Sequence, residues 1–314
     1  MADYLLRLTL NAPLGSPLHS GTLFGHLCWA LRYQDSEAAL GDWLAELPEA
    51  PFLLSDGLPA GWLPRPLLAP PPRLSQQEGE TRDEFRKKLE QSKQLRKRGW
   101  IRIEDFRALR DRLNETRLAS RLDPKDSPPM PSRVRTAHNT IHRHTGTTSD
   151  SGGLYFMGED WYGEDARERD VYVRTTLPRE RVAGLFSLVG ELGFGRDATL
   201  GRGQFWAELT DPPTGLFDFE GNRCLSLSHG SRSPNMAAPR YKRHTHYGKV
   251  GGLYAGGVMS PFKRPLLLCR PGATFAPADA GPFGELLAGV HPHDPSIRHN
   301  AWHLTVPFNE EVSS

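Results

Sequence analysis

The chain of 314 residues has little cysteine, no long apolar run and no strong excess of charge. Its three cysteines, Cys28, Cys224 and Cys269, are far apart and form no C-x-x-C pair, which excludes a disulfide framework and a zinc ribbon. No apolar stretch approaches the roughly 20 residues that cross a membrane, and the start, Met1-Ala-Asp, lacks a basic signal-peptide region. We therefore expect a cytoplasmic globular protein that has reduced thiols and no contact with a membrane.

The near-neutral total charge of +2 hides an uneven distribution. Residues 1–80 contain four Lys/Arg against nine Asp/Glu, whereas residues 81–121 contain fourteen against seven. The basic segment favours an anionic partner, and the acidic part favours a different one. Because acids and bases are interleaved over residues 81–98, a solvated helix without nucleic-acid contact is an equally good interpretation there.

The hydrophobic periodicity predicts an α+β chain. In the first half, the expected elements follow the order strand, helix, strand, then strand, helix, strand, with an insertion between the two groups. This order fits a ferredoxin-like (RRM-like) sheet that has its helices on one face. The strands are expected at residues 4–10, 52–55, 153–157, 170–174 and 205–209, and the helices at 20–33, 36–47 and from 178 onward.

A Pro-Pro-Thr-Gly run ending at Gly215 resembles a domain boundary. Beyond it, candidate strands at 224–228, 265–269 and 302–306 predict a degenerate copy of the same module. We predict an N-terminal RRM-like domain over 1–215 and a C-terminal one over 216–314. Residues of about 73–150 form an insertion, of which the charged helical part (81–121) is expected to lie outside the core.

The segment GFGRDATLGRG (193–203) joins an amphipathic helix to an apolar strand. Glycines at such a junction allow close approach of a phosphate, which backbone N–H groups can hold, and the two arginines add forked donors. The alternative is an ordinary glycine-rich turn. The residues expected to contact RNA here are Gly195, Arg196, Gly201, Arg202 and Gly203.

The run His19, Ser20, Gly21 and Thr22 stands at the expected start of the first helix. The free N–H groups of a helix N-terminus favour an anion, which suggests a phosphate contact. Ser20 is also a suitable N-cap, so simple capping is the alternative interpretation.

Three histidines, His138, His142 and His144, invite a metal-site interpretation. No Glu follows His138 as in a zincin motif, and the Thr and Gly content disfavours a helix, so we expect no metal and no cofactor. Acid–base ribonuclease chemistry by two of the histidines at positions 19, 26, 138 and 142 is a second alternative. We expect RNA contact instead, with Arg133, Arg135 and Arg143 on phosphates and His138 and Asn139 on bases or sugars.

The block over residues 240–249 combines basic residues with two tyrosines and contains no acid. Such interleaving suits backbone pairing together with base stacking, and we assign Lys242, Arg243 and Lys249 to RNA binding. A flexible surface loop is the competing interpretation.

Taken together, five segments resemble a known family. Residues 19–30, 138–146 with 152–155, 193–203, 247–253 and 263–275 are similar, in this order, to the RAMP-superfamily subunit that holds the crRNA 5′ handle in type III-A CRISPR (Csm) complexes. The match spans most of the chain except residues 73–130.

The resemblance implies two RRM-like modules and a non-catalytic role in antiviral defence. The protein would cap the foot of the complex and bind the crRNA 5′ handle. Its protein partners would be the large polymerase-like subunit and the neighbouring backbone RAMP subunit. The alternative within the superfamily is a Cas6-like endoribonuclease that processes pre-crRNA without metal.

Overall fold

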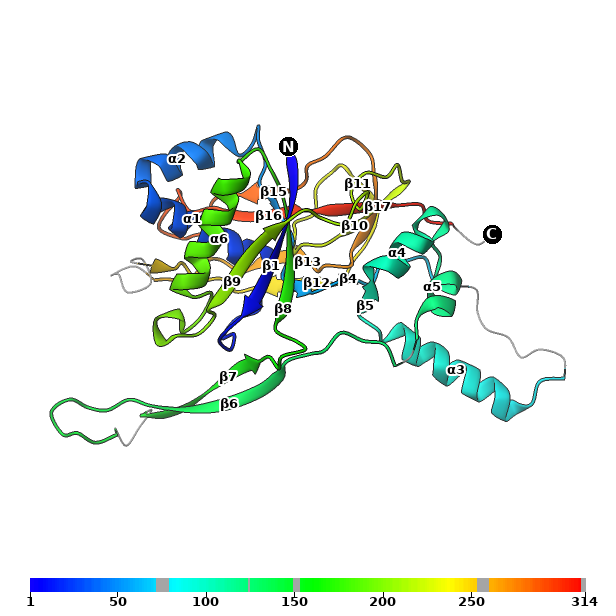
Figure 1. Ribbon diagram of the computed structural model, residues 1–314, viewed down its shortest axis with the longest axis horizontal. Helices are drawn as coiled ribbons and strands as arrows, with labels where there is room; N and C mark the ends of the chain where they lie inside the picture. Colours follow the sequence, from blue (N-terminus) through cyan, green and yellow to red (C-terminus); the bar gives the residue numbers. More distant parts are fainter. Residues whose placement is uncertain (72–78, 124, 149–152, 253–259, 312–314) are drawn as a thin grey trace.

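The computed structural model describes residues 1–71, 79–123, 125–148, 153–252 and 260–311. Within these residues the chain is a mixed α+β structure with several small antiparallel sheets, as predicted (Figure 1). Gly152 and Leu253, which belong to the motifs quoted above, lie outside the described residues, as does part of the expected insertion.

The main sheet is built around β1 (Ala2–Leu10), which pairs with β8 (Glu168–Thr175) on one side and β9 (Phe205–Thr210) on the other. The short strands β2 (Leu53–Leu54) and β3 (Leu58–Pro59) pair with the other edge of β8. Every pair is antiparallel, and the sheet order is β2-β8-β1-β9. Four of the five strands expected in the first half belong to this sheet.

Two helices pack against each other beside this sheet, α1 (Ser20–Gln34) and α6 (Arg179–Leu192), and α6 lies along β9 (Figure 1). The shorter α2 (Glu37–Glu46) follows α1 and begins after Ser36, whose hydroxyl accepts the N–H of Ala39. The amphipathic helix expected before the glycine-rich segment is confirmed, because α6 has a stripe of buried apolar side chains. Its members are Val182, Leu185, Phe186 and Val189.

The second half consists, within the described residues, of strands without a helix. Its largest sheet has the order β11-β14-β10-β17, formed by β11 (Met236–Arg240), β14 (Thr274–Pro277), β10 (Arg223–Ser226) and β17 (Thr305–Phe308). Two further pairs are β12 (Arg243–His246) with β13 (Leu266–Cys269), and β15 (Phe283–Leu287) with β16 (His299–His303). The single strand expected at 302–306 is therefore wrong, because Leu304 separates two strands of different sheets.

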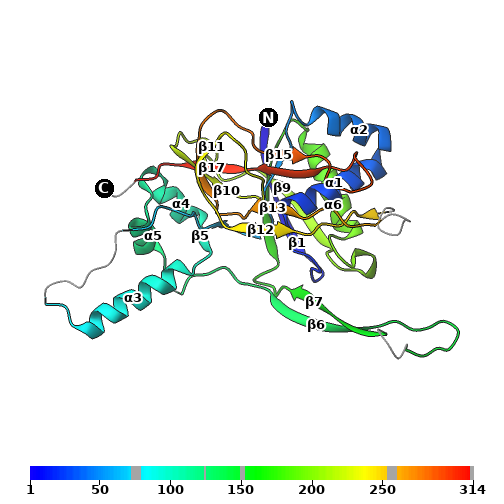
Figure 2. The same cartoon turned by 180° about the vertical axis from the view of Figure 1, so that it is seen from behind.

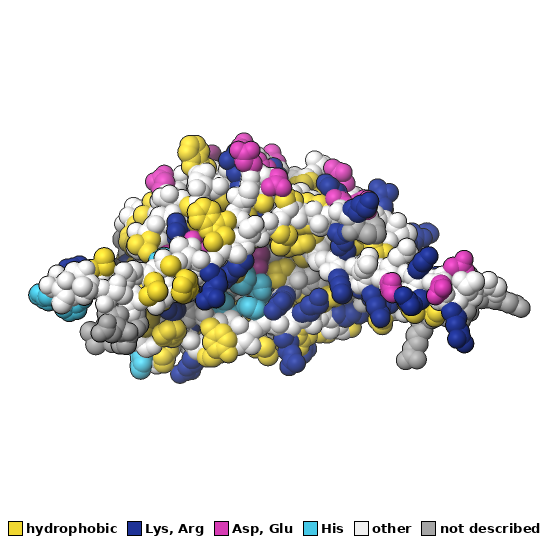
Figure 3. Space-filling view, turned by 90° about the horizontal axis from the view of Figure 1, so that it is seen from below, with side chains coloured by type: hydrophobic (Ala, Val, Ile, Leu, Met, Phe, Trp, Pro, Cys, Tyr) yellow, Lys and Arg dark blue, Asp and Glu magenta, His cyan; other side chains and the backbone are white. Residues whose placement is uncertain are grey.

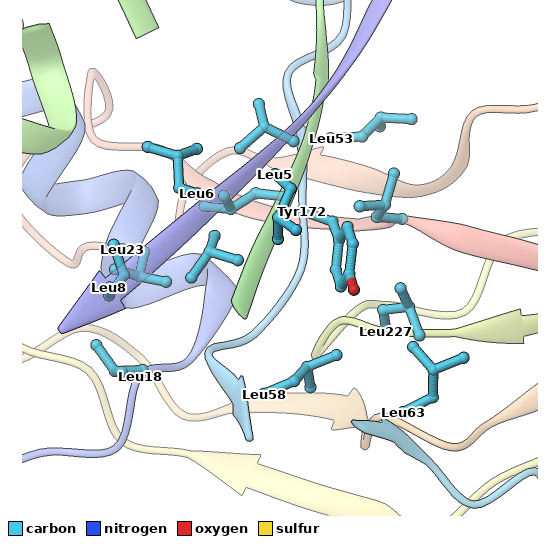
Figure 4. Close-up of a cluster of buried hydrophobic side chains, with 14 of the residues drawn as sticks. Leu5, Leu6, Leu8, Leu18, Leu23, Leu53, Leu58, Leu63, Tyr172 and Leu227 are labelled. Carbon is cyan, nitrogen blue, oxygen red and sulfur yellow. The ribbon is translucent and has the colours of Figure 1, made fainter. Parts of the chain in front are cut away.

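The main hydrophobic core is shared by both halves of the chain. Leu6 and Leu8 of β1 belong to the same buried cluster as Leu227, which follows β10 (Figure 4). Leu225 of β10 is a further member of this cluster. Apolar residues of both halves are thus removed from water together, which couples their stability. The domain boundary at residue 215 stays a prediction.

The insertion contains two different parts (Figures 1 and 2). Helix α3 (Arg82–Arg96) has no buried residue and projects from the body, as expected of a charged arm. The part after it forms β5 (Trp100–Arg102), α4 (Ile103–Leu109), the 3-10 turn η1 (Arg110–Arg112) and α5 (Glu115–Arg121), with β5 pairing to β4 (Trp62–Pro64).

The expectation that all of residues 81–121 lie outside the core is wrong for this second part. Ile101, Phe106 and Leu113 are fully buried, and the ring of Phe106 lies 6.2 Å from that of Phe308. These apolar residues are few among many charged ones, so the average polarity of residues 81–121 conceals them.

The contact between α6 and β9 gives a stability test with an internal control. A Cβ added to Gly190 would lie 2.1 Å from the carbonyl oxygen of Phe205, whereas one added to Gly184 on the same helix meets nothing nearer than 3.9 Å. Gly190→Ala is expected to lower the free energy of unfolding by about 2–3 kcal/mol through overpacking. Gly184→Ala is expected to raise it by about 0.5–1 kcal/mol through helix propensity. Urea unfolding measures both, and equal stability of the two variants would contradict this packing.

Candidate nucleic-acid interface

The glycine-rich loop after α6 is held by its own hydrogen bonds. The N–H groups of Phe194 and Gly203 donate to Gly203 O and Pro13 O, each at 2.9 Å, and that of Gly195 donates to Nε2 of His26 at 2.9 Å. Burial lowers the pKa of His26 to about 4, so its neutral ring can accept this bond. The N–H of Gly201 donates to Ala198 O within the 3-10 turn η2 (Ala198–Leu200).

These bonds correct the prediction that Gly195, Gly201 and Gly203 direct their N–H groups at a phosphate. The glycines are needed for a different reason. Each has a φ between +71° and +80°, a region that side chains with a Cβ rarely enter. Gly203 also lies so close to Phe194 that a Cβ would meet its carbonyl oxygen at 2.0 Å. The loop is a close-packed turn, which was the alternative interpretation.

The two arginines of this loop reach across to strand β7 (Leu154–Trp161). A guanidinium nitrogen of Arg196 donates to the carbonyl of Gly158 at 2.6 Å, and Nε of Arg202 donates to Glu159 at 2.8 Å. Burial alone would raise the pKa of Glu159, but the hydrogen bond and charge of Arg202 outweigh it and lower the pKa. The arginines thus anchor β7. Their expected contact with phosphate stays a prediction.

Strand β7 pairs with β6 (Ser132–Asn139) in a hairpin that projects from the body (Figures 1 and 2). The guanidinium of Arg135 lies 5.3 Å from the ring centre of Phe156, and His138 stacks on Tyr155 at 5.4 Å. Arg133 pairs with Asp160 at 2.8 Å, and Asn139 accepts a hydrogen bond from Thr148. The large apolar side chains exposed on β6 and β7 are Val134, Leu154, Tyr155, Phe156 and Trp161.

This hairpin is an unusual surface. Two-stranded hairpins are marginally stable alone, and contiguous exposed apolar side chains mark binding sites. The combination of arginine with exposed aromatic rings suits a nucleic-acid strand, since rings stack on bases and arginine pairs with phosphate. Arg143, His142 and His144 lie exposed near the tip of the hairpin, where the rings of the two histidines are 5.6 Å apart.

The start of α1 already holds an anion. Its N-cap is His19 and not Ser20, which corrects that prediction. The N–H of Ser20 donates to Oδ1 of the buried Asp56 at 3.0 Å, and the hydroxyl of Ser20 donates to the carbonyl of His229. Ser20 and Gly21 are buried, so the expected phosphate contact at this helix end is replaced by an internal carboxylate; Thr22 and His19 remain half-buried.

The imidazole of His19 belongs to a cluster that the sequence did not reveal. Its ring centre lies 4.0 Å from that of His229 and 5.2 Å from that of His244, while His229 and His244 are 4.6 Å apart. His246 follows, with its ring 6.2 Å from that of His244 and 5.1 Å from that of the buried His299. The only signal in the sequence was the alternation Arg-His-Thr-His of β12, which places both histidines of that strand on one face.

Burial sets the ionisation of this cluster. It lowers the pKa of His19 and of His246 to about 4 in each case, so both rings are neutral near pH 7. Burial alone would raise the pKa of Asp56, but His19, His229 and the N–H of Ser20 together lower it below its usual range. A charged Asp56 accepts Nδ1–H of His229 at 2.6 Å and its backbone N–H at 3.0 Å.

The basic block over residues 240–249 contains the ordered strand β12, which pairs with β13 outside the block, so it is not only a flexible loop. Lys242 and Arg243 are exposed, and the ammonium of Lys249 lies 4.6 Å from the ring centre of the exposed Phe262. Figure 3 shows the lower face of the molecule, with histidines near its middle and Lys and Arg on both sides. Hydrophobic side chains are interspersed among them.

Comparison with known proteins finds similar structures but no similar sequence. No family model and no curated protein matches the chain. A chain in the crystal structure of a Csm1–Csm4 cassette with AMPPNP superposes with a TM-score of 0.60 at 15% identity, over 99% of this chain and 100% of that one. A chain in a Csm3–Csm4 subcomplex of the type III-A CRISPR-Cas interference complex gives 0.60 at 13% identity, over 98% and 99%.

The chain therefore has the overall fold of a chain from each of these assemblies, as the resemblance implies. The cassette bound to cA4 gives a similar value of 0.58 at 16% identity, over 99% of this chain and 100% of that one. No helix among the described residues is both long and apolar enough to span a membrane.

The ion pair between Arg202 and Glu159 generates a pH-dependent prediction. Because Glu159 is fully buried, Arg202→Met leaves its carboxylate unpaired and is expected to cost about 3 kcal/mol at pH 7. Because the folded pKa of Glu159 is lowered, the pair stabilises fully above the unfolded value of about 4.3, and this stabilisation is lost progressively as the pH falls from there through the folded pKa. The stability difference between wild type and Arg202→Met should therefore shrink as the pH falls from about 7 to 3.

The control is Arg133→Met on the same hairpin, whose ion pair with Asp160 is more exposed. It is expected to cost less than about 1 kcal/mol. Urea unfolding at several pH values measures all three proteins. A difference for Arg202→Met that stays constant with pH would contradict this account of Glu159.

Proposed function

We propose that the chain is a non-catalytic crRNA-binding subunit of a type III CRISPR effector complex. The observation that carries this proposal is the full-length likeness to chains of two assemblies whose descriptions share one component, Csm4. The same descriptions support two protein partners, a large polymerase-like subunit and a neighbouring backbone RAMP subunit. In this proposal the protein acts in the cytoplasm, in antiviral defence, and caps the foot of the complex.

The main sheet supports a ferredoxin-like module. The succession β1, α1, β2, β8, α6, β9 and the order β2-β8-β1-β9 are consistent with a split βαβ arrangement that has the insertion between β2 and β8. RRM-like sheets of this type are frequent RNA-binding modules. The strands after residue 215 are proposed to be the degenerate second copy.

The RNA is proposed to follow the lower face, between the hairpin and the β12 strand. Arg135 with Phe156, and Lys249 with Phe262, each place a cation against an exposed ring. Lys242 and Arg243 add exposed charge, while His138 and Asn139 offer polar groups near the outer end of β6. The glycine-rich loop contributes indirectly, because Arg196 and Arg202 hold the hairpin.

The absence of catalysis is also part of the proposal. Two-histidine ribonuclease chemistry needs one neutral ring as base and one protonated ring as acid. In the cluster, the pKa of His19 and that of His246 are lowered to about 4, so neither ring carries the proton that a leaving oxygen needs at pH 7. His26, another candidate, is engaged with the N–H of Gly195, and His138 with Tyr155.

Binding is tested with Arg135→Ala. Arg202 is unsuitable because its loss also unpairs a buried carboxylate. With RNA that carries a repeat-derived 5′ handle, Arg135→Ala is expected to weaken affinity several-fold and to reduce the salt slope by about one. Arg179→Ala, which removes an exposed arginine outside the hairpin, should change neither. If Arg135→Ala behaves like this control, the proposed RNA path is wrong.

Catalysis is tested with the purified chain and repeat RNA in EDTA between pH 5 and 8. We expect stable binding without cleavage over the whole range. Cleavage by wild type that His19→Ala or His246→Ala abolishes would instead establish the Cas6-like alternative. Mutation of the exposed His144 serves as the matched control, because its ring lies at the hairpin tip.

A further inference from the structure

Three of the clustered histidines present ligand atoms to one point. His19 lies at the N-cap of α1, His229 follows β10 and His244 lies in β12, so three separate elements position them. One ring nitrogen from each lies within 4.8 Å of the other two. Three nitrogens around a tetrahedral zinc ion are about 3.4 Å apart. Because His19 and His244 are half-buried at the surface, a modest rotation of their rings would bring the three nitrogens to that spacing.

The ring of His229 is already oriented by the carboxylate of Asp56. Oδ2 of Asp56 accepts the Nδ1–H of His229, which leaves Nε2 with its lone pair. Asp56 is itself fixed, because it also accepts the backbone N–H groups of Ser20 and His229. A buried carboxylate behind a histidine is the usual support of a metal ligand, since it fixes the ring and makes the nitrogen more basic. It also supplies negative charge against a bound cation.

We propose that His19, His229 and His244 bind one divalent transition-metal ion, with zinc as the preferred metal. Imidazole nitrogen is a ligand of zinc, nickel, cobalt and copper, and three histidines with an open fourth position form a known type of zinc site. The neutral state of His19 near pH 7 agrees with this role, because a ligand must offer a lone pair.

The surroundings offer further ligand capacity. His246 lies on the same face of β12 as His244, and His299, which contacts His246, is buried with both ring nitrogens unpartnered within the described residues. None of these histidines belongs to the hairpin group His138, His142 and His144, for which the sequence suggested a metal site. The proposed site also differs from the expectation that the protein holds no metal. The inference goes beyond the proposed RNA function and does not depend on it.

The test is metal binding by the full chain without RNA and without a polyhistidine tag. The protein is stripped with EDTA, dialysed and titrated with zinc against a colorimetric chelator. We expect one zinc per chain, and we expect His19→Ala and His244→Ala each to raise the Kd at least about tenfold. Asp56→Asn is expected to raise it about 10–100-fold. His144→Ala, an exposed histidine outside the cluster, should bind zinc as wild type does.

Cobalt gives an independent readout of geometry. Wild type loaded with Co²⁺ should show the intense visible bands of four-coordinate cobalt, and His244→Ala should lose them. Circular dichroism and cooperative thermal unfolding establish that each variant is folded. The proposal is overturned if wild type binds no zinc, if His19→Ala and His244→Ala bind it as tightly as wild type, or if His144→Ala is the variant that loses it.

Discussion

The buried carboxylate of Asp56 joins three parts of the molecule that are distant in sequence. It lies in the turn between β2 and β3, and it receives N–H groups from the start of α1 and from the segment after β10. A buried charge is tolerated only where several donors satisfy it, so this carboxylate fixes the relative positions of all three segments. The position of His19 beside His229 follows from that constraint.

A second buried carboxylate, Glu159, does the same for the projecting hairpin. Arg202 of the glycine-rich loop holds it, and Arg196 binds the neighbouring carbonyl of Gly158. The loop is in turn fixed to α1 through His26. The exposed aromatic and basic side chains of the hairpin are therefore presented from a rigid base, although the hairpin itself has little core of its own.

The two buried carboxylates, Asp56 and Glu159, fix the segments that form the face rich in histidine, arginine and hydrophobic side chains (Figure 3). Some polar groups that the sequence pattern assigns to a ligand form hydrogen bonds within the protein instead. The N–H groups of Ser20 and Gly195 are examples. The side chains left for a partner are mainly those on strands, such as Arg135, Phe156 and Arg243. The hairpin projects from the body and is exposed along most of β6 and the first half of β7, so Arg135 and Phe156 stay at the surface together with neighbours such as Val134 and Tyr155.

The sequence by itself determined the local elements. The periodicity of α6, the alternation of β1 and the charged character of α3 are local properties, and the structure confirms them. It also marked residues 193–203 as a glycine-rich junction, but the positive φ values that require glycine at positions 195, 201 and 203 are seen only in the structure. Only the tertiary structure decided which donors stay free, that residues 100–122 enter the core, and that His19, His229 and His244 meet. Those facts depend on contacts between residues up to 225 positions apart, which no local pattern encodes.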